Sequence, residues 1–389
     1  MAVFRSEHSD GMAEISESKP TSRSGDANAT QRLQPNTLVN GYLLEHLPIY
    51  RELCELRRQG WQNEAGDTHF QQQRQRADNA DDKGKVVFFK MMRAIGLELD
   101  RATSALTIQG GGNSQPAILD LCMAPGGFSA AALYRNPSAL VRGISLPPSQ
   151  GGHEMLLREA STTDSDAQVY VSFRDITLLA GEMGTSASNI PASHPEATSF
   201  SFDRPFLEQK FDLVFCDGQV LRTHERLEYR EKREASRLLT AQLVLALQRI
   251  REGGTMVILL HKADVWRSVS LMYTFATFSD SVELFKPQKP HALRSSFYLI
   301  AKGVGPELDA ALESVRRWKE IWTTATFGLG GTGEDGSGDE ESEVGQSGEH
   351  ADEKVRAVLQ EFGPKLVKIV EPVFSIQAKA LKNAPWMKK

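Results

Sequence analysis

Seven short apolar segments, alternating with longer amphipathic ones, constrain the fold of this chain more than any other feature. They are "AILDLCM" (117–123), "VRGISL" (141–146), "VYVSFRDI" (169–176), "FDLVFCD" (211–217), "TMVILLH" (255–261), "VELF" (282–285) and "FYLIA" (297–301). Several are apolar at successive positions, as strands buried on both faces of a parallel sheet require. Helical patterns intervene at 128–135, 228–251 and 265–278.

This alternation predicts an α/β fold with a doubly wound, mostly parallel seven-stranded sheet. Ligands of such sheets bind at the carboxyl ends of the strands. The last two apolar segments lack room for a long helix between them, so they predict an antiparallel pair at the sheet edge.

The segments outside this core differ in composition. Residues 1–35 are polar and predict a disordered lead, and 36–303 form the main domain. Within 36–97, "YLLEHLPIYRELCELRRQG" and "KVVFFKMMRAIGLEL" predict helices on either side of a polar connection. After Gly303 we expect a helical extension (304–326), an acidic disordered linker (327–353) and a basic helical tail (354–389). The tail packs on the main domain, pairs with the acidic linker or contacts RNA.

Composition limits the class of protein. The formal net charge of the 389 residues is −5, so any contact with nucleic acid depends on local patches. The three cysteines lack metal-ligand spacing, and no metal is expected. No secretion signal and no run of 18 apolar residues is found, which predicts a soluble, intracellular protein of nucleus or cytoplasm without a membrane partner.

A glycine turn follows the first apolar segment. "ILDLCMAPGGFSAAAL" places Asp120 in a strand and Pro125, Gly126 and Gly127 where the strand turns into a helix. Glycines let the backbone approach a ligand closely. The spacing of a dinucleotide fingerprint is absent, so this motif alone is equally compatible with an ordinary turn.

The stretch D-L-x-x-A-P-G-G-F-S resembles the first motif of the FtsJ-like ribose 2′-O-methyltransferases, and the resemblance extends over about residues 84 to 303. It implies a Rossmann-like methyltransferase fold, S-adenosylmethionine (AdoMet) as cofactor, and RNA as partner, whether cap, ribosomal or transfer RNA. It further implies that Ala124, Pro125, Gly126 and Gly127 face the methionine part of AdoMet and that Phe128 begins the next helix. Ser145 occupies the position where many AdoMet enzymes place a carboxylate on the ribose.

The same resemblance implies that Asp175 accepts a hydrogen bond from the adenine amino group and that Ile176 packs on the ring. The alternative for Asp175 is a cap on the following turn.

Three members of the family's Lys-Asp-Lys-Glu tetrad match this chain at Lys90, Asp217 and Lys262. The resemblance implies that Lys262 is the general base, with its pKa lowered by partial burial and by the charge of Lys90. Asp217 then orients Lys262 and faces the cationic methyl donor. Considered singly, a lysine at a strand end is more often a solvated charge, and Asp before Gly is usually a turn residue.

The fourth tetrad position departs from the family. "KPQKPHALRSSFYLIAKG" places Ser296 where the resemblance predicts a glutamate. Loss of that carboxylate favours neutral Lys262 but also removes a partner that orients it. A catalytically impaired relative that binds AdoMet or RNA is therefore the alternative function. Methylation of a small molecule or a protein is a third class that the net acidity leaves open.

Arginines recur after Asp217 at helical spacing: Arg222, Arg226, Arg230, Arg233 and Arg237. On one helix they share a face and predict a phosphate track beside the site. Interleaved glutamates favour the alternative of a salt-bridged, solvated helix. His291 and Arg294, before the last strand, are placed to contact RNA as well.

Overall fold

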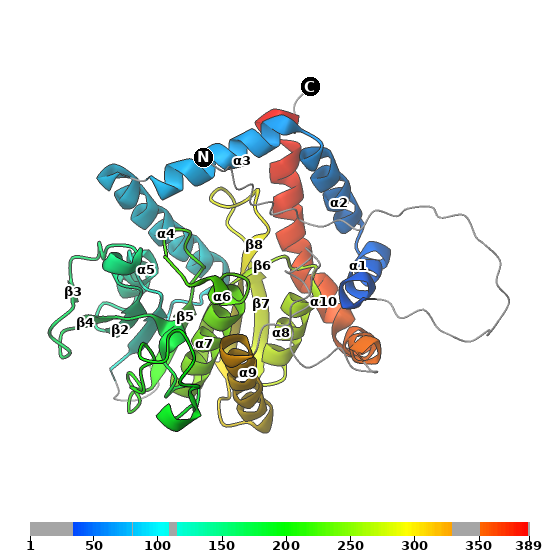
Figure 1. Cartoon of the computed structure of the whole chain (residues 1–389). Helices are drawn as coiled ribbons and strands as arrows, with labels where there is room; N and C mark the ends of the chain where they lie inside the picture. Colours follow the sequence, from blue (N-terminus) through cyan, green and yellow to red (C-terminus); the bar gives the residue numbers. More distant parts are fainter. Residues whose placement is uncertain (1–33, 80, 109–114, 329–350, 388–389) are drawn as a thin grey trace.

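A mixed sheet forms the centre of the computed structural model, which describes residues 34–79, 81–108, 115–328 and 351–387 (Figure 1). The predicted lead lies outside these residues up to residue 33, and the predicted linker does so from 329 to 350. The strand order is β3-β4-β2-β1-β5-β6-β8-β7. The strands are β1 (Ala117–Leu121), β2 (Leu140–Ser145), β3 (Ala160–Ser161), β4 (Val169–Phe173), β5 (Phe211–Cys216), β6 (Ile250–His261), β7 (Ser279–Phe285) and β8 (Ser296–Val304).

The predicted doubly wound fold is confirmed. All seven predicted segments are strands, and the eighth strand, β3, has two residues and therefore no pattern to read. Strands β1 to β6 pair in parallel, whereas β8 is antiparallel to both β6 and β7, so the expected antiparallel pair lies at the edge. In the register, Leu121 pairs with Cys216. The strand ends that precede the glycine turn and Asp217 are therefore adjacent.

Two helical layers cover the sheet (Figure 1). On one face lie α4 (Asp82–Thr103) and α5 (Gly127–Arg135), which bury Leu99 and Phe128 against the strands. On the other face lie α7 (Glu234–Arg249) and α8 (Trp266–Ala276). The short α6 (Glu228–Glu231) precedes α7, and α9 (Asp309–Phe327) packs on α7. Four 3₁₀ turns complete the described elements: η1 (Pro148–Gln150), η2 (Ile176–Leu178), η3 (Ala187–Asn189) and η4 (Pro385–Met387).

The N-terminal helices differ from the prediction in two ways. The first pattern is two helices, α1 (Pro35–His46) and α2 (Pro48–Trp61), because Pro48 cannot continue the hydrogen-bond ladder of α1. The polar connection, for which the sequence predicts no element, is helix α3 (Glu64–Asp78), capped by the Asn63 side chain. Its Gln-rich sequence lacks the apolar periodicity on which the prediction depends.

The C-terminal helix α10 (Ala351–Lys382) begins before the expected tail, and it packs against α1, α2 and α8. Its apolar side is buried through Phe362, Leu366, Val370 and Phe374. Among the described helices, none combines the length and the apolar character needed to cross a membrane.

Candidate active site

A cavity of about 170 Å³ opens at the carboxyl ends of the parallel strands. Its wall includes predicted site residues from four strand ends: Ala124 after β1, Ser145 of β2, Asp175 and Ile176 after β4, and Asp217 after β5. Helix α4 adds an apolar side through Phe88, Met91, Met92 and Ile95. This apolar wall with a few convergent polar groups is the usual composition of a small-molecule site.

The glycine turn is shaped by the packing of its neighbours. Gly126 has φ of 97°, in the left-handed region that favours glycine, and it caps the amino end of α5. At Gly127 a Cβ would lie 2.5 Å from Met92 Cβ and 2.7 Å from the Phe89 carbonyl oxygen. The second glycine is therefore required for the approach of α4 to the turn, whether or not a ligand is bound. Pro125 follows a cis peptide bond, and the buried Phe128 packs beneath the turn.

We expect Gly127→Ala to lower the free energy of unfolding by about 1–3 kcal/mol, because the added methyl group has no space beside α4. The matched control is Gly41→Ala in α1, where a Cβ meets nothing within 4 Å and helix propensity predicts a small gain. Urea denaturation followed by circular dichroism measures both. Equal stability of the two variants would contradict this packing argument.

Ser145 connects the second strand to the glycine turn. Its hydroxyl accepts a hydrogen bond of 3.2 Å from the Ala124 backbone N–H, and its side chain is buried. Beneath the turn, Ser129 donates to Asp120 at 2.5 Å. Burial raises the pKa of Asp120 to about 7, although the Ser129 hydrogen bond lowers it.

Asp217 is a half-buried acid in the cavity wall. Among the described residues, its Oδ1 atom is buried without a hydrogen-bond partner. Burial raises the pKa of Asp217 well above its usual range, and the nearby Asp120 raises it further. A buried polar atom without a partner is costly, so this oxygen is suited to a donor or a cation that enters the cavity.

Gln242 of α7 holds the turn that positions Asp217, and sequence reasoning missed it. Its Oε1 accepts from the Gly218 N–H at 2.8 Å, and its Nε2 donates to the Gly218 carbonyl at 3.3 Å. Gly218 has no space for a side chain, because a Cβ would lie 2.4 Å from Cys122 Sγ. Gln242 is an interior polar residue in an apolar helix, a signal that is visible in the sequence only as an exception to the pattern.

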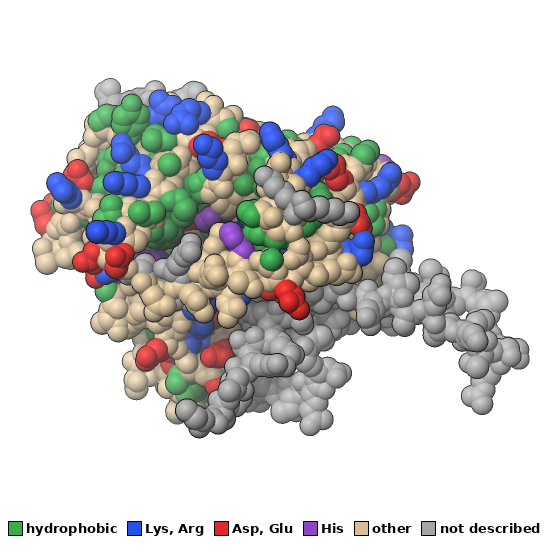
Figure 2. All heavy atoms as spheres, turned by 90° about the horizontal axis from the view of Figure 1, so that it is seen from above, with side chains coloured by type: hydrophobic (Ala, Val, Ile, Leu, Met, Phe, Trp, Pro, Cys, Tyr) green, Lys and Arg blue, Asp and Glu red, His purple; other side chains and the backbone are tan. Residues whose placement is uncertain are grey.

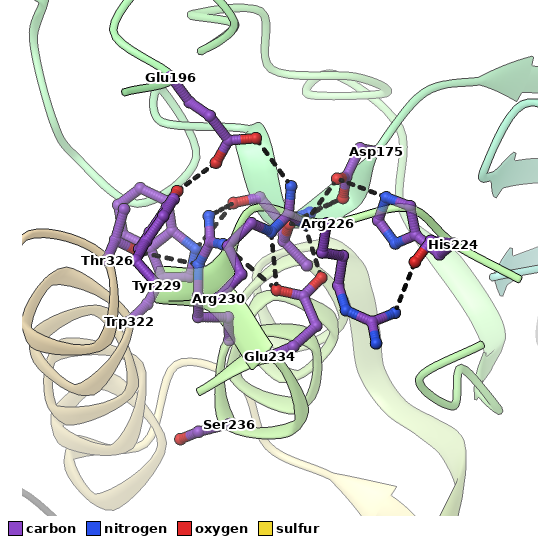
Figure 3. A network of polar contacts seen from close by, with 12 residues as sticks. Asp175, Glu196, His224, Arg226, Tyr229, Arg230, Glu234, Ser236, Trp322 and Thr326 are labelled. Atoms are coloured by element: carbon purple, nitrogen blue, oxygen red, sulfur yellow. Dashed lines mark hydrogen bonds and ion pairs between the residues drawn. The ribbon is translucent and has the colours of Figure 1, made fainter. Parts of the chain in front are cut away.

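Asp175 lines the cavity while its carboxylate is held by the protein (Figure 3). Its Oδ1 accepts from Thr177 N and Oγ1 at 2.9 and 2.8 Å, which caps η2, and its Oδ2 accepts from Arg230 at 2.8 Å. Burial alone would raise the pKa of Asp175, but the Arg230 guanidinium and the Thr177 hydrogen bonds hold it below its usual value. A hydrogen bond from adenine to Asp175 comes in addition to the bonds that Thr177 and Arg230 already donate.

The predicted arginine track is wrong. Arg222 and Arg226 precede α6, and the helix is interrupted between α6 and α7. The five arginines therefore do not share one helix face. Arg230 and Arg237 are buried at 2% and 0% exposure. Arg230 pairs with Asp175, Glu196 and Glu234, and Arg237 pairs with Glu234 (Figure 3). Of the interleaved glutamates, Glu234 therefore forms ion pairs, but it does so inside the protein and not on a solvated helix face.

Asp175, His224 and Glu234 also form a group whose ligand atoms lie within 4.8 Å of one another. Both carboxylates already accept hydrogen bonds from Arg230. The guanidinium supplies the positive charge that a metal ion would supply.

The two predicted lysines lie apart from the cavity wall. Lys90 is exposed on α4, and Phe88, Met91 and Ile95 are among the α4 side chains that line the cavity. At 100° per residue, Lys90 lies on the opposite side of the helix. Lys262 follows the last residue of β6 with φ of 52°, and its N–H donates to the Ser295 carbonyl. The cavity lining contains Asp217 but neither lysine.

Leu259 and Tyr298 occupy the β6 and β8 side of the cavity, where they are paired in the register. Burial raises the pKa of Tyr298 well above its usual value, and Asp217 raises it further. Ser296 is buried, stands opposite His261 in the register, and begins β8. Strand alternation directs the Leu259 and Tyr298 side chains toward the cavity. A match of motif letters does not take this alternation into account.

Comparisons with known proteins were made by sequence and by structure. The model of the FtsJ-like methyltransferase family matches residues 97–304, more than half of the chain. No curated protein matches the chain by sequence. A putative ribosomal RNA methyltransferase from Plasmodium falciparum is 18% identical with a TM-score of 0.32, and the match covers 55% of this chain and 96% of that one.

Two further solved structures are similar at the same level. TrmN from Thermus thermophilus is 16% identical over 54% of this chain and 48% of its own, with a TM-score of 0.30. An rRNA methylase from Streptococcus thermophilus is 11% identical over 55% of this chain and 95% of its own, with a TM-score of 0.29. The family match confirms the resemblance that the glycine turn predicts: the chain belongs to the FtsJ-like methyltransferase family, AdoMet-dependent enzymes with a Rossmann-like fold.

Proposed function

We propose that the chain transfers a methyl group from AdoMet to a ribose 2′-hydroxyl of RNA. The observation that carries the proposal is the buried Asp217 Oδ1, which has no partner among the described residues and lies in a cavity beside the glycine turn. When bound, AdoMet supplies an electrophilic methyl group on a cationic sulfonium. An acidic group in an apolar cavity suits such a cation, because the low dielectric strengthens the attraction.

We assign the binding of AdoMet to the residues at the four strand ends. Ala124, Pro125, Gly126, Gly127 and Phe128 form the turn, and Ser145 holds it to β2 through the Ala124 N–H. Asp175 and Ile176 form the opposite end of the cavity wall. There Thr177 and Arg230 fix the carboxylate, so Asp175 enters the site already oriented.

Lys262 is our proposed proton acceptor, with Asp217 and Lys90 as its partners. Lys262 lies at the end of β6, next to His261, whose Nε2 is 2.6 Å from Gln219 Oε1 on the loop after Asp217. For Lys262 to act, its side chain has to turn toward the cavity when the RNA is bound. Hydrogen bonds of catalytic groups often tighten only in the substrate complex.

A second function is favoured by the cavity wall itself. Met91, Leu259 and Tyr298 line the cavity, while Lys90 and Lys262 do not, and the tetrad glutamate is Ser296. Tyr298 is a poor base because its pKa is raised. These observations support a relative that binds AdoMet and RNA without efficient transfer.

Radiolabelled AdoMet, total RNA and digestion to nucleosides distinguish the two functions. The proposed enzyme yields labelled 2′-O-methylnucleosides, and Lys262→Ala abolishes the label while AdoMet affinity measured by calorimetry stays nearly intact. AdoMet binding without any label in RNA would establish the second function instead. Absence of AdoMet binding would refute both.

Asp217→Asn is expected to weaken AdoMet binding about 10- to 150-fold, because a hydrogen bond to a charged group contributes about 1.5–3 kcal/mol. In the wild type, the raised pKa of Asp217 means that a bound cation displaces its proton. AdoMet affinity should therefore rise with pH as Asp217 ionises, and the asparagine variant should not show this dependence. Calorimetry in buffers of different ionisation enthalpy measures both; an unchanged pH profile in the variant would assign the proton to another group.

A further inference from the structure

Helix α3 crosses the carboxyl edge of the sheet and links α2 to α4 (Figure 1). It is held at its start by the C-terminal segment: Asn63 Nδ2 donates to the Trp386 carbonyl at 2.6 Å. The Trp386 ring lies 4.5 Å from His69 and 5.6 Å from Phe70, centroid to centroid. The C-terminal segment therefore holds in place a polar helix that has no apolar face of its own.

Three arginines from distant segments lie on or near this helix. Arg294, on the loop between β7 and β8, donates to Gln73 Oε1 of α3 at 3.4 Å. Arg74 follows Gln73 in α3, and Arg222 lies between Leu221 and His224, which line the cavity. Partial burial and the charges of Arg222 and Arg74 lower the pKa of Arg294. Each of the three residues is exposed. We call Arg74, Arg222 and Arg294 the arginine cluster.

Lys286 fixes the loop that carries Arg294. Its buried ammonium donates to the backbone carbonyls of His291, Arg294 and Ser296 at 3.2, 2.6 and 2.8 Å. On the same loop, His291 lines the cavity. Arg294 of the arginine cluster therefore lies three residues from a residue that lines the cavity, on a loop whose backbone is held in place.

The face seen from above the sheet edge carries many Lys and Arg side chains around a hollow in which His side chains are visible (Figure 2). The chain as a whole has a net charge of −5, so this concentration of cations is local. A local concentration of positive charge attracts a polyanion. A polyanion that follows the edge of the cavity meets this requirement along its length.

We propose that the arginine cluster binds the phosphate backbone of a single-stranded RNA whose ribose enters the cavity, with α3 as the outer wall of the path. The inference rests on the proposed function, because it takes RNA as the substrate. It adds the place where the strand lies and gives a role to α3 and to the C-terminal segment. Phosphate contacts of this kind position a strand without reading its sequence.

Fluorescence anisotropy with a labelled single-stranded RNA of about 12 nucleotides tests the cluster, since single-strand sites span about 4–16 nucleotides. Arg74→Gln and Arg294→Gln should each weaken binding about equally for all sequences and reduce the salt dependence by roughly 0.7 per lost contact. The control, Arg316→Gln, changes an exposed arginine of α9 that pairs with Glu313 and Glu320. Wild-type affinity and salt slope in both cluster variants would overturn the proposal, even if the RNA is methylated.

Trp386→Ala tests the role of α3 separately. Loss of the ring that packs on His69 and Phe70 should weaken RNA binding, while AdoMet affinity by calorimetry is unchanged. Unchanged RNA affinity would overturn the assignment of α3 as a wall. A polyglutamate peptide serves as the competing probe: if it binds through the cluster and the RNA does not, the partner is an acidic protein and the RNA proposal fails. If the wild-type protein binds no RNA, the RNA substrate of the proposed function is refuted as well. If only the variants lose RNA affinity, their AdoMet affinity should stay intact.

Discussion

Replacement of Arg230 by methionine is expected to lower the free energy of unfolding by about 3–5 kcal/mol, the usual cost of removing one partner from a buried ion pair. Arg230 is 2% exposed and donates to Asp175, Glu196 and Glu234 at 2.6–3.0 Å. Methionine fills similar space but leaves three carboxylates without their shared cation. The same change removes the bond that orients Asp175, so AdoMet affinity should fall with stability.

The loss from Arg230→Met depends on pH in a defined direction. In the wild type the pKa of Asp175 is lowered, so this group contributes stability at pH values above its usual pKa and loses it as the pH falls. Without Arg230, burial raises the pKa of Asp175, and the folded variant then loses stability as the pH rises. The difference in the free energy of unfolding between wild type and Arg230→Met should therefore be largest at neutral pH and smaller in acid.

Urea denaturation at several pH values measures this effect, with Arg316→Met as the matched control. Arg316 also pairs with two glutamates, but on the surface of α9, where its side chain is 60% exposed. Its replacement should change stability little, because solvent screens exposed pairs. If both variants lose the same free energy of unfolding, or if the loss from Arg230→Met does not depend on pH, Arg230 does not stabilise the protein through the buried network.

The sheet could be predicted from the sequence because each strand carries its own pattern. Runs such as Leu213–Cys216 are apolar whatever surrounds them, and a parallel sheet is the fold that buries both of their faces. Helix α3 could not be predicted in this way, since its order depends on Trp386, more than 300 residues away. Likewise, the arginines after Asp217 look solvated until Glu196 and α9 are packed around them.

The candidate site also contains residues that the local sequence predicts and residues whose position it does not predict. The glycine turn and Asp217 can be found in the sequence because strand ends and turns are local features, and the register brings them together. Lys262 is placed by matching letters at a strand end, where a shift of a few residues changes whether a side chain faces the cavity. Leu259 lies within β6 and lines the cavity, whereas Lys262 lies three residues later and beyond the strand.

Trp322→Ala is the second large effect that we expect, with a loss of about 3–5 kcal/mol in the free energy of unfolding. Trp322 of α9 is fully buried, and its ring lies 6.2 Å from Phe200 and 5.7 Å from Phe327. Its Nε1 donates to the Thr177 carbonyl at 3.0 Å, and Thr177 lines the cavity (Figure 3). The substitution should therefore weaken AdoMet binding as well as the fold.

The matched control is Trp61→Ala in α2, where the side chain is 47% exposed and the expected change is within about 0.5 kcal/mol. Urea denaturation and calorimetry with AdoMet measure both variants. If α9 were only an appended helix, Trp322→Ala would melt it locally and leave the main transition and the AdoMet affinity unchanged. A joint loss would instead show that α9 is part of the domain, because its tryptophan supports the turn that presents Asp175 and Ile176 to the cavity.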